Sequence, residues 1–215
     1  MAIRADARSK LRSALAVAAL AAMLTLALAA LAHFTQDRIA RNRQAWLMQR
    51  LDALIAPESH DNDLFDDRIQ VTAADLLGTD VPAEIFRVRK AGQPIAVAIR
   101  YVVPDGYRGP IELLTAIQYD GTLIGVQVLR HNETPGLGDA FETRDPQWLR
   151  RFEGLSLSDP PQQRWTVRKE GGDFDAFTGA TTTPRAIVKG VRRALEFYSA
   201  HRDRLFSLPS GTRNE

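Results

Sequence analysis

The sequence has no cysteine among its 215 residues. This absence excludes disulfide bonds, iron–sulfur clusters, thiolate zinc sites and cysteine nucleophiles. Histidine is also rare, with only four in the chain. Because His33, His60, His131 and His201 lack the spacing of metal ligands, we expect no metal site.

The chain also lacks a large excess of charge of one sign. Lysine and arginine number 28 and aspartate and glutamate 26, so the formal net charge is only +2. The excess lies in residues 1–33, where four basic side chains against one acidic one give +3 and leave −1 for the rest of the chain. This balance does not indicate nucleic-acid binding, and we expect no nucleic-acid partner.

Long hydrophobic runs are absent except for one. Ser13–Ala32 has 20 residues without a charge, and a helix with a rise of about 1.5 Å per residue then spans the roughly 30 Å hydrocarbon core of a bilayer. The basic residues before it place residues 1–12 in the cytoplasm and the chain after His33 across the membrane. A cleaved signal peptide is the alternative, but its apolar segment is only about 7–15 residues long, so we favour a permanent anchor at 13–32.

Residues 33–68 follow as a predicted stalk helix and linker. Leu47, Leu51 and Leu54 recur at helical spacing, which indicates a helix that leaves the membrane. Pro57 is expected to end this helix, and the acidic segment 58–67 has the composition of a loop before the globular domain.

Segments rich in β-branched and aromatic residues come next, separated by turn signals. The predicted strands are Glu84–Arg89, Pro94–Val103, Ile111–Tyr119, Leu123–Leu129 and a short one at Trp165–Lys169. Asp120-Gly121 lies between the third and the fourth strand. This dipeptide predicts a two-residue turn and therefore an antiparallel hairpin.

The last predicted element is a long helix that begins at Thr183-Pro184. The hydroxyl residue serves as the cap, proline occupies the first helical position, and apolar residues recur at helical spacing up to Tyr198. Residues 208–215 are expected to be a flexible tail. We predict an α+β domain over residues 69–207, with a mostly antiparallel sheet and helices packed at its ends.

Three glycine-containing segments are the candidate functional positions: 105–111, 131–138 and 175–184. Each has an ordinary interpretation as well. The first reads as a Gly/Pro connection with a tyrosine on the sheet edge, and the second as a loop with a structural glutamate. The third is less ordinary, because it has four threonines between residues 178 and 183, whereas one suffices to cap a helix.

Helix amino termini carry a partial positive charge and unpaired amides, which stabilise a nearby phosphate by about 1 kcal/mol. The third segment therefore predicts a phosphate-bearing ligand near Thr181–Thr183. Gly179 and Ala180 are small enough to leave a neighbouring hydroxyl accessible. The residues do not decide between a bound and a covalently attached ligand. A nucleotide-triphosphatase phosphate loop is disfavoured, because no Gly-Lys-Ser/Thr follows.

Three motifs carry a resemblance to a known family. Asp175–Thr181 reads Asp-Ala-Phe-Thr-Gly-Ala-Thr and resembles the covalent flavinylation signature Asp-x-x-Ser/Thr-Gly-Ala-Thr of FMN-binding domains. Glu133–Gly138 resembles the second motif of the same domain, and Gly106–Ile111 matches a third pattern, Gly-Tyr-x-Gly-x-Ile. With these motifs in order after a single anchor, most of residues 10–207 resemble the G subunit of the Rnf-type electron transport complex, called Rsx in some bacteria.

The resemblance implies an FMN that is joined through its phosphate to the hydroxyl of Thr181, the last residue of the signature. Thr178 occupies an earlier position and is not the expected acceptor. A separate flavin transferase would use FAD as donor and release AMP, and Asp175 is assigned to its recognition sequence. Other FMN contacts are expected at Thr178, Gly179 and Ala180 of the signature turn, and around the isoalloxazine ring at Glu133, Thr134, Leu137, Gly138 and Tyr107.

The resemblance also implies a function. The chain would be a non-autonomous redox subunit that relays electrons between NADH and ferredoxin, coupled to cation translocation, with no catalytic side chain of its own. Other membrane subunits of the complex would be its partners, in a bacterial inner membrane with the domain in the periplasm. Two alternatives stay open: the generally longer FMN-bearing C subunit of the sodium-translocating NADH:quinone reductase, and a flavin-free membrane-tethered binding module.

Overall fold

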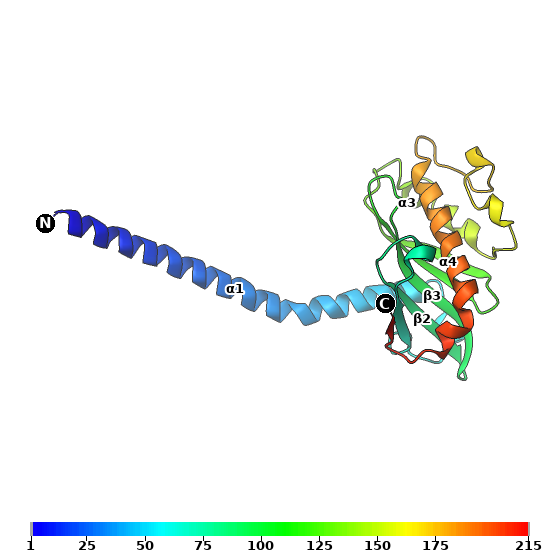
Figure 1. The fold of residues 1–215 in the computed structure, drawn as a ribbon, viewed down its shortest axis with the longest axis horizontal. Helices are drawn as coiled ribbons and strands as arrows, with labels where there is room; N and C mark the ends of the chain where they lie inside the picture. The colour runs from blue at the N-terminus through cyan, green and yellow to red at the C-terminus, as the bar shows by residue number, and fades with distance from the viewer. Residues whose placement is uncertain (1, 215) are drawn as a thin grey trace. The chain divides into compact units, whose positions relative to one another are not determined.

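The computed structural model describes residues 2–214, and side chains at residues 15–74 and 77–213. The chain forms two compact units, the first ending at Gln49 and the second beginning at Arg50. Figure 1 shows the long helix α1 and, in the second unit, helix α4 alongside strands β2 and β3. The short helical elements are η1 (Pro57–Ser59), α2 (Ala74–Leu77), α3 (Ala140–Thr143), η2 (Trp148–Phe152), η3 (Gln162–Arg164) and η4 (Arg168–Glu170).

Helix α1 (Ala2–Asp52) is continuous over 51 residues, a length of about 76 Å. The predicted anchor and stalk are therefore one element, which ends at Asp52, before Pro57. Large apolar side chains are exposed along it from Leu15 to Phe34. A helix that is apolar on all sides requires an apolar surrounding. By its length and composition, the part of α1 from Leu15 onward qualifies as a candidate membrane span.

Six strands form one sheet in the order β5-β4-β3-β2-β1-β6. Neighbouring strands are antiparallel except β1 and β6, which are parallel. The predicted α+β class with a mostly antiparallel sheet is thus confirmed. The strands are β1 (Arg68–Val71), β2 (Ala83–Lys90), β3 (Gln93–Val103), β4 (Ile111–Gln118), β5 (Leu123–Arg130) and β6 (Arg213–Asn214).

The hairpin between β4 and β5 is confirmed, although its turn is wider than predicted. The strands end at Gln118 and resume at Leu123, and the amide of Gln118 donates to the carbonyl oxygen of Thr122 over 2.8 Å. Gly121 has φ 99°, a conformation that only glycine adopts without strain. The glycine therefore closes a four-residue connection instead of a two-residue turn.

Two expectations about the second half of the chain were wrong. Trp165–Lys169 is not a strand, since η4 begins at Arg168 and Val167 forms only an isolated bridge with Phe174. Residues 208–215 were expected to be a flexible tail, but Arg213 and Asn214 form β6, which pairs with β1; residue 215 lies outside the described residues. Strand pairing of this kind depends on partners far along the chain, which local composition does not reveal.

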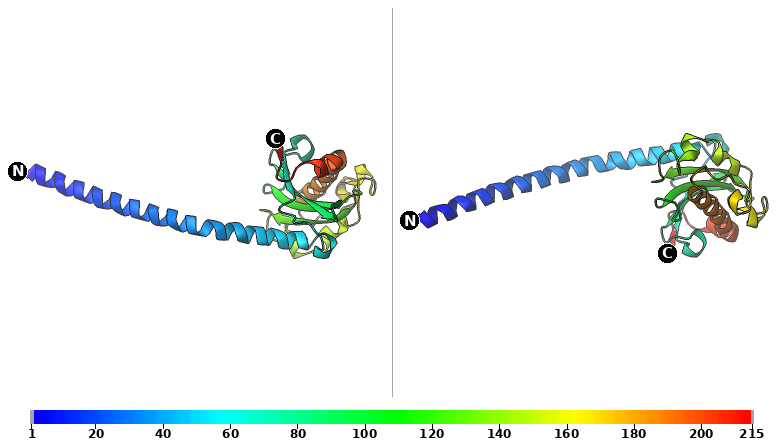
Figure 2. Two further views of the ribbon diagram at one scale, coloured as in Figure 1. Left: turned by 90° about the horizontal axis from the view of Figure 1, so that it is seen from below. Right: turned by 90° about the horizontal axis from the view of Figure 1, so that it is seen from above.

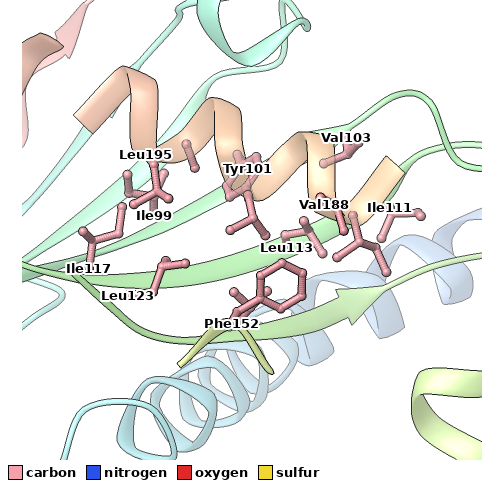
Figure 3. Close-up of a cluster of buried hydrophobic side chains, with 14 of the residues drawn as sticks. Ile99, Tyr101, Val103, Ile111, Leu113, Ile117, Leu123, Phe152, Val188 and Leu195 are labelled. Carbon is pink, nitrogen blue, oxygen red and sulfur yellow. The ribbon is translucent and has the colours of Figure 1, made fainter. Parts of the chain in front are cut away.

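Helix α4 (Thr182–Ser207) covers one face of the sheet (Figure 2). Its side chains Val188 and Leu195 face β3 and β4 in the buried cluster of Figure 3. A Cβ atom at Gly190 would lie under 3.0 Å from Val103 Cγ2. The absence of a side chain at Gly190 therefore lets the helix approach β3 closely, which brings the start of α4 near the loops that follow β3 and β5.

The opposite face of the sheet is covered by residues 50–64 (Figure 2). Leu51, Ile55 and Leu64 are at most 3% exposed, and Leu54 Cδ2 would lie 2.9 Å from a Cβ atom on Gly125 in β5. These residues, which the sequence assigns to the stalk and linker, thus belong to the second compact unit. A sheet that is covered on both faces explains why its strands are apolar on successive residues.

Candidate functional site

The three glycine-containing segments meet around one cavity of about 300 Å³. It lies where the loops after β3 and β5 meet the start of α4. Of the nine residues that the sequence indicates as FMN contacts, eight line it: Tyr107, Glu133, Thr134, Leu137, Gly138, Gly179, Ala180 and Thr181. Thr182 and Thr183 complete the lining, whereas Thr178 is exposed and does not contribute.

Helix α4 begins one residue earlier than expected, and its cap differs. Thr181 is the N-cap residue, and no side-chain hydrogen bond caps the helix. Thr183, which we expected to be the cap, is instead the second helical residue and is 0% exposed. Its hydroxyl donates to Glu133 Oε2. The expectation was wrong because a partner 50 residues away in sequence competes with the local amides for this hydroxyl.

Glu133 connects the three segments. Its side chain is 4% exposed, and Oε1 accepts the backbone N–H of Arg108 over 3.1 Å while Oε2 accepts the hydroxyl of Thr183. Both oxygens of a buried carboxylate are thus hydrogen-bonded, as burial of such a group requires. The carboxylate holds the first segment, the second segment and the start of α4 in one arrangement.

The signature turn is held in place by aromatic packing that the sequence did not reveal. Phe177 packs against Trp148 with ring centroids 5.1 Å apart, and Trp148 Nε1 donates to the carbonyl oxygen of Asp175 over 2.9 Å. The carboxylate of Asp175 forms ion pairs with Arg151 and Arg168. Asp175 therefore has a structural role in holding this turn.

An ion pair joins the first glycine-containing segment, 105–111, to α4. Lys189 Nζ lies 2.6 Å from Asp105 Oδ2. The hydrogen bond from Lys189 lowers the pKa of Asp105, although partial burial opposes this shift. Tyr107 and Leu137, by contrast, are 70% and 43% exposed, so the rim of the cavity offers apolar and aromatic surface to a ligand.

The residues present fit a flavin with a phosphate. The hydroxyl of Thr181 has no hydrogen bond among the described residues, and it lies at the amino terminus of a 26-residue helix, where a phosphate is stabilised. The exposed aromatic and apolar rim suits a planar ring. Among the side chains that the structure describes, at residues 15–74 and 77–213, there is no cluster of three or more potential metal ligands.

Comparison with known proteins agrees with this geometry. Residues 106–196 match the FMN-binding domain family. The G subunit of the ion-translocating oxidoreductase complex of Shewanella amazonensis is 42% identical over 207 residues, 96% of either chain. The G subunits of the same complex from Shewanella loihica and Pseudomonas aeruginosa are 43% and 41% identical, over 88% and 94% of this chain and 90% and 95% of their own.

The matched domain contains the cavity, and the matches to these G subunits extend over nearly the whole chain. The resemblance found in the sequence is therefore confirmed. All three relatives are G subunits by name, which favours this family over the C subunit of the quinone reductase. The chain belongs to the family of G subunits of the ion-translocating oxidoreductase complex and carries an FMN-binding domain.

Proposed function

We propose that this chain carries FMN as a phosphoester on Thr181 and relays electrons through it within a membrane-bound ion-translocating oxidoreductase complex. The observation that carries this proposal is the position of the Thr181 hydroxyl. It has no hydrogen-bond partner among the described residues, and it lines the cavity at the amino terminus of α4. The names of the relatives support a redox subunit within an assembly of several subunits. Helix α1 supports anchorage in a membrane.

The attachment reaction needs a hydroxyl that can enter another enzyme's active site. Thr181 Oγ1 attacks the phosphorus on the flavin side of FAD, and the new O–P bond forms as the bond to the AMP half breaks. AMP leaves with the bridging oxygen, and the hydroxyl proton passes to a base of the transferase. Afterwards the phosphodiester lies at the amino terminus of α4, which favours negative charge by about 1 kcal/mol.

The bound FMN supplies redox chemistry with one or two electrons, and the protein supplies its position. Tyr107 and Leu137 would contact the ring, and because both side chains are exposed themselves, they would hold it at an exposed position. Exposure of this kind suits electron exchange with another subunit. We propose NADH and ferredoxin as the ends of the electron path of the complex, a bacterial inner membrane as its location and the periplasm for the FMN-binding domain.

Peptide mass spectrometry tests the proposal on the full chain, produced together with a flavin transferase. The tryptic peptide 170–185 contains all four threonines between residues 178 and 183. We expect it to carry the mass of FMN less one water, with fragment ions that place the addition on Thr181. Thr181→Ala should remove both this mass and the in-gel flavin fluorescence.

Thr166→Ala is the matched control, because Thr166 lies outside the cavity and outside the tryptic peptide. Its flavin content should equal that of the parent. An unmodified peptide from the parent chain, made with an active transferase, would support the flavin-free binding module instead. Flavin retained by Thr181→Ala would show that another residue is the acceptor.

A further inference from the structure

The third glycine-containing segment, 175–184, has four threonines, and they differ in their surroundings. Thr178 is exposed and lies outside the cavity. Thr183 is 0% exposed and donates its hydroxyl to Glu133. Thr181 and Thr182 are partly exposed and line the cavity. The buried hydrogen bond therefore removes one hydroxyl from reach and fixes the helical turn that begins immediately after Thr181.

Glu133 is held too tightly to be a mobile ligand contact. Its two oxygens accept hydrogen bonds from two other segments, and its backbone N–H donates to His131 Nδ1 over 3.2 Å. A Cβ atom at Gly138 would lie 2.7 Å from Glu133 Oε2 and 3.0 Å from Thr183 Oγ1. Backbone thus closes over the carboxylate, which leaves it little freedom to change rotamer.

We propose that Glu133 is the positioning residue for flavin attachment. By binding Thr183 Oγ1, it fixes the first turn of α4 and so holds the hydroxyl of Thr181, two residues earlier, at the mouth of the cavity. The inference rests on the proposed attachment of FMN to Thr181. Its physical basis is that group transfer depends steeply on geometry, so that a displacement of about 1 Å costs up to about 100-fold in rate.

This role assigns Glu133 to the formation of the flavoprotein rather than to the redox step. Loss of the hydrogen bond should let the start of α4 fray, since no side-chain cap holds it in place. Thr181 would then sample several positions, and Thr182 and Thr183 would become accessible to the transferase. The expected consequences are slower attachment and loss of selectivity among the threonines.

The test measures the initial rate of flavin incorporation into the unmodified full-length chain by purified transferase with FAD, followed by site mapping. Thr183→Val removes the hydroxyl and keeps the shape, whereas Thr183→Ser keeps the hydroxyl. We expect Thr183→Val and Glu133→Gln to slow incorporation by roughly tenfold or more, and Thr183→Ser to stay within about twofold of the parent. In the Thr183→Val background, Glu133→Gln should have no further effect, because Glu133 acts through Thr183.

Glu153→Gln controls for the loss of a carboxylate, because Glu153 is 47% exposed and pairs only with Arg150 among the described residues. Thermal unfolding of each unmodified variant reports the folded fraction, and rates are compared per folded molecule. A Thr183→Val rate close to that of the parent, or a slowing explained by the folded fraction, would overturn the inference. A parent chain that takes up no flavin would overturn the proposed function itself, so the two failures are distinguishable.

Discussion

Arg87 in β2 forms an ion pair with Asp67, the residue before β1, and its side chain is only 1% exposed. The same guanidinium donates to the carbonyl oxygens of Leu205 and Leu208 and to Ser210 Oγ. One buried cation therefore joins the sheet to the end of α4 and to the segment that follows it. The first turn of α4 lines the cavity, so these contacts of Arg87 hold the helix at the end opposite the site.

Asp67→Asn should destabilise the domain, because it leaves the charge of Arg87 buried without its anion. Removal of one partner of a buried charged pair costs about 2–3 kcal/mol in the free energy of unfolding. In a chain of this size, we expect the melting temperature to fall by roughly 5–10 °C. Thermal unfolding of the detergent-solubilised full-length chain measures this shift.

The neighbouring Asp66 offers a matched control. Its side chain is exposed, so Asp66→Asn makes the same chemical change without stranding a buried charge and should alter the melting temperature by no more than about 2 °C. Equal effects of the two substitutions would mean that net charge, and not the ion pair between Asp67 and Arg87, determines the stability.

The stability that Asp67 provides should disappear in acid. Burial opposes ionisation of this carboxyl, but hydrogen bonds from Ser210 and Arg89 and the charge of Arg87 outweigh it, so the pKa of Asp67 lies below its ordinary value of 3.8. The unfolded chain then binds the proton more readily than the folded one. By linkage, the contribution of the ion pair is complete above the ordinary pKa and is lost as the pH falls through the folded pKa.

The difference in melting temperature between the parent and Asp67→Asn isolates this contribution, because all other carboxyls are common to both proteins. We expect the difference to be constant between about pH 5 and 7 and to shrink below about pH 4. A difference that stays constant down to pH 3 would show that the lowered pKa of Asp67 does not contribute to the stability.

The length of a strand determines whether its sequence alone predicts it. Strands β2 to β5 have eight residues or more, and each carries enough β-branched and aromatic residues to be recognised alone. Strands β1 and β6 have four and two residues, and β6 depends on pairing with β1, about 140 residues earlier in the chain. No local pattern encodes a pairing of that range.

The site shows the same limit. The motifs name residues that line the cavity, because each motif is local in the sequence. The hydrogen bond between Glu133 and Thr183 was not predictable, since it needs the register of the hairpin and the placement of α4 together. Thr183 was mistaken for a cap because a hydroxyl next to a proline is a typical start of a helix. Tertiary contact overrode the local preference.

Gly190→Ala should destabilise the domain even though alanine favours helix by about 1 kcal/mol over glycine. The new methyl group would overlap Val103 Cγ2, and α4 and β3 are both buried at this contact. Overpacking of a core costs about 1–3 kcal/mol, so the net loss should be up to about 2 kcal/mol, or roughly 4–8 °C in melting temperature.

Val103→Ala supplies the compensating change, because it removes the methyl groups that the new side chain would meet. The double variant should recover part of the stability that the two single variants lose together, which a double-mutant cycle of melting curves measures. If the stability losses of the two single variants are strictly additive in the double variant, the destabilisation by Gly190→Ala does not come from its contact with Val103.

Leu137→Ala should change the surroundings of the flavin without unfolding the protein. Leu137 is 43% exposed and would lie 3.3 Å from a Cβ atom on Gly179, so it reaches across the cavity toward the signature turn. Its truncation should cost less than about 1 kcal/mol of stability, but it should open the proposed ring position to solvent. Iodide quenching of the attached FMN is expected to become stronger.

Val81→Ala is the matched control, because Val81 is 47% exposed and lies away from this cavity. Equal quenching in the parent and both variants would show that Leu137 does not cover the ring.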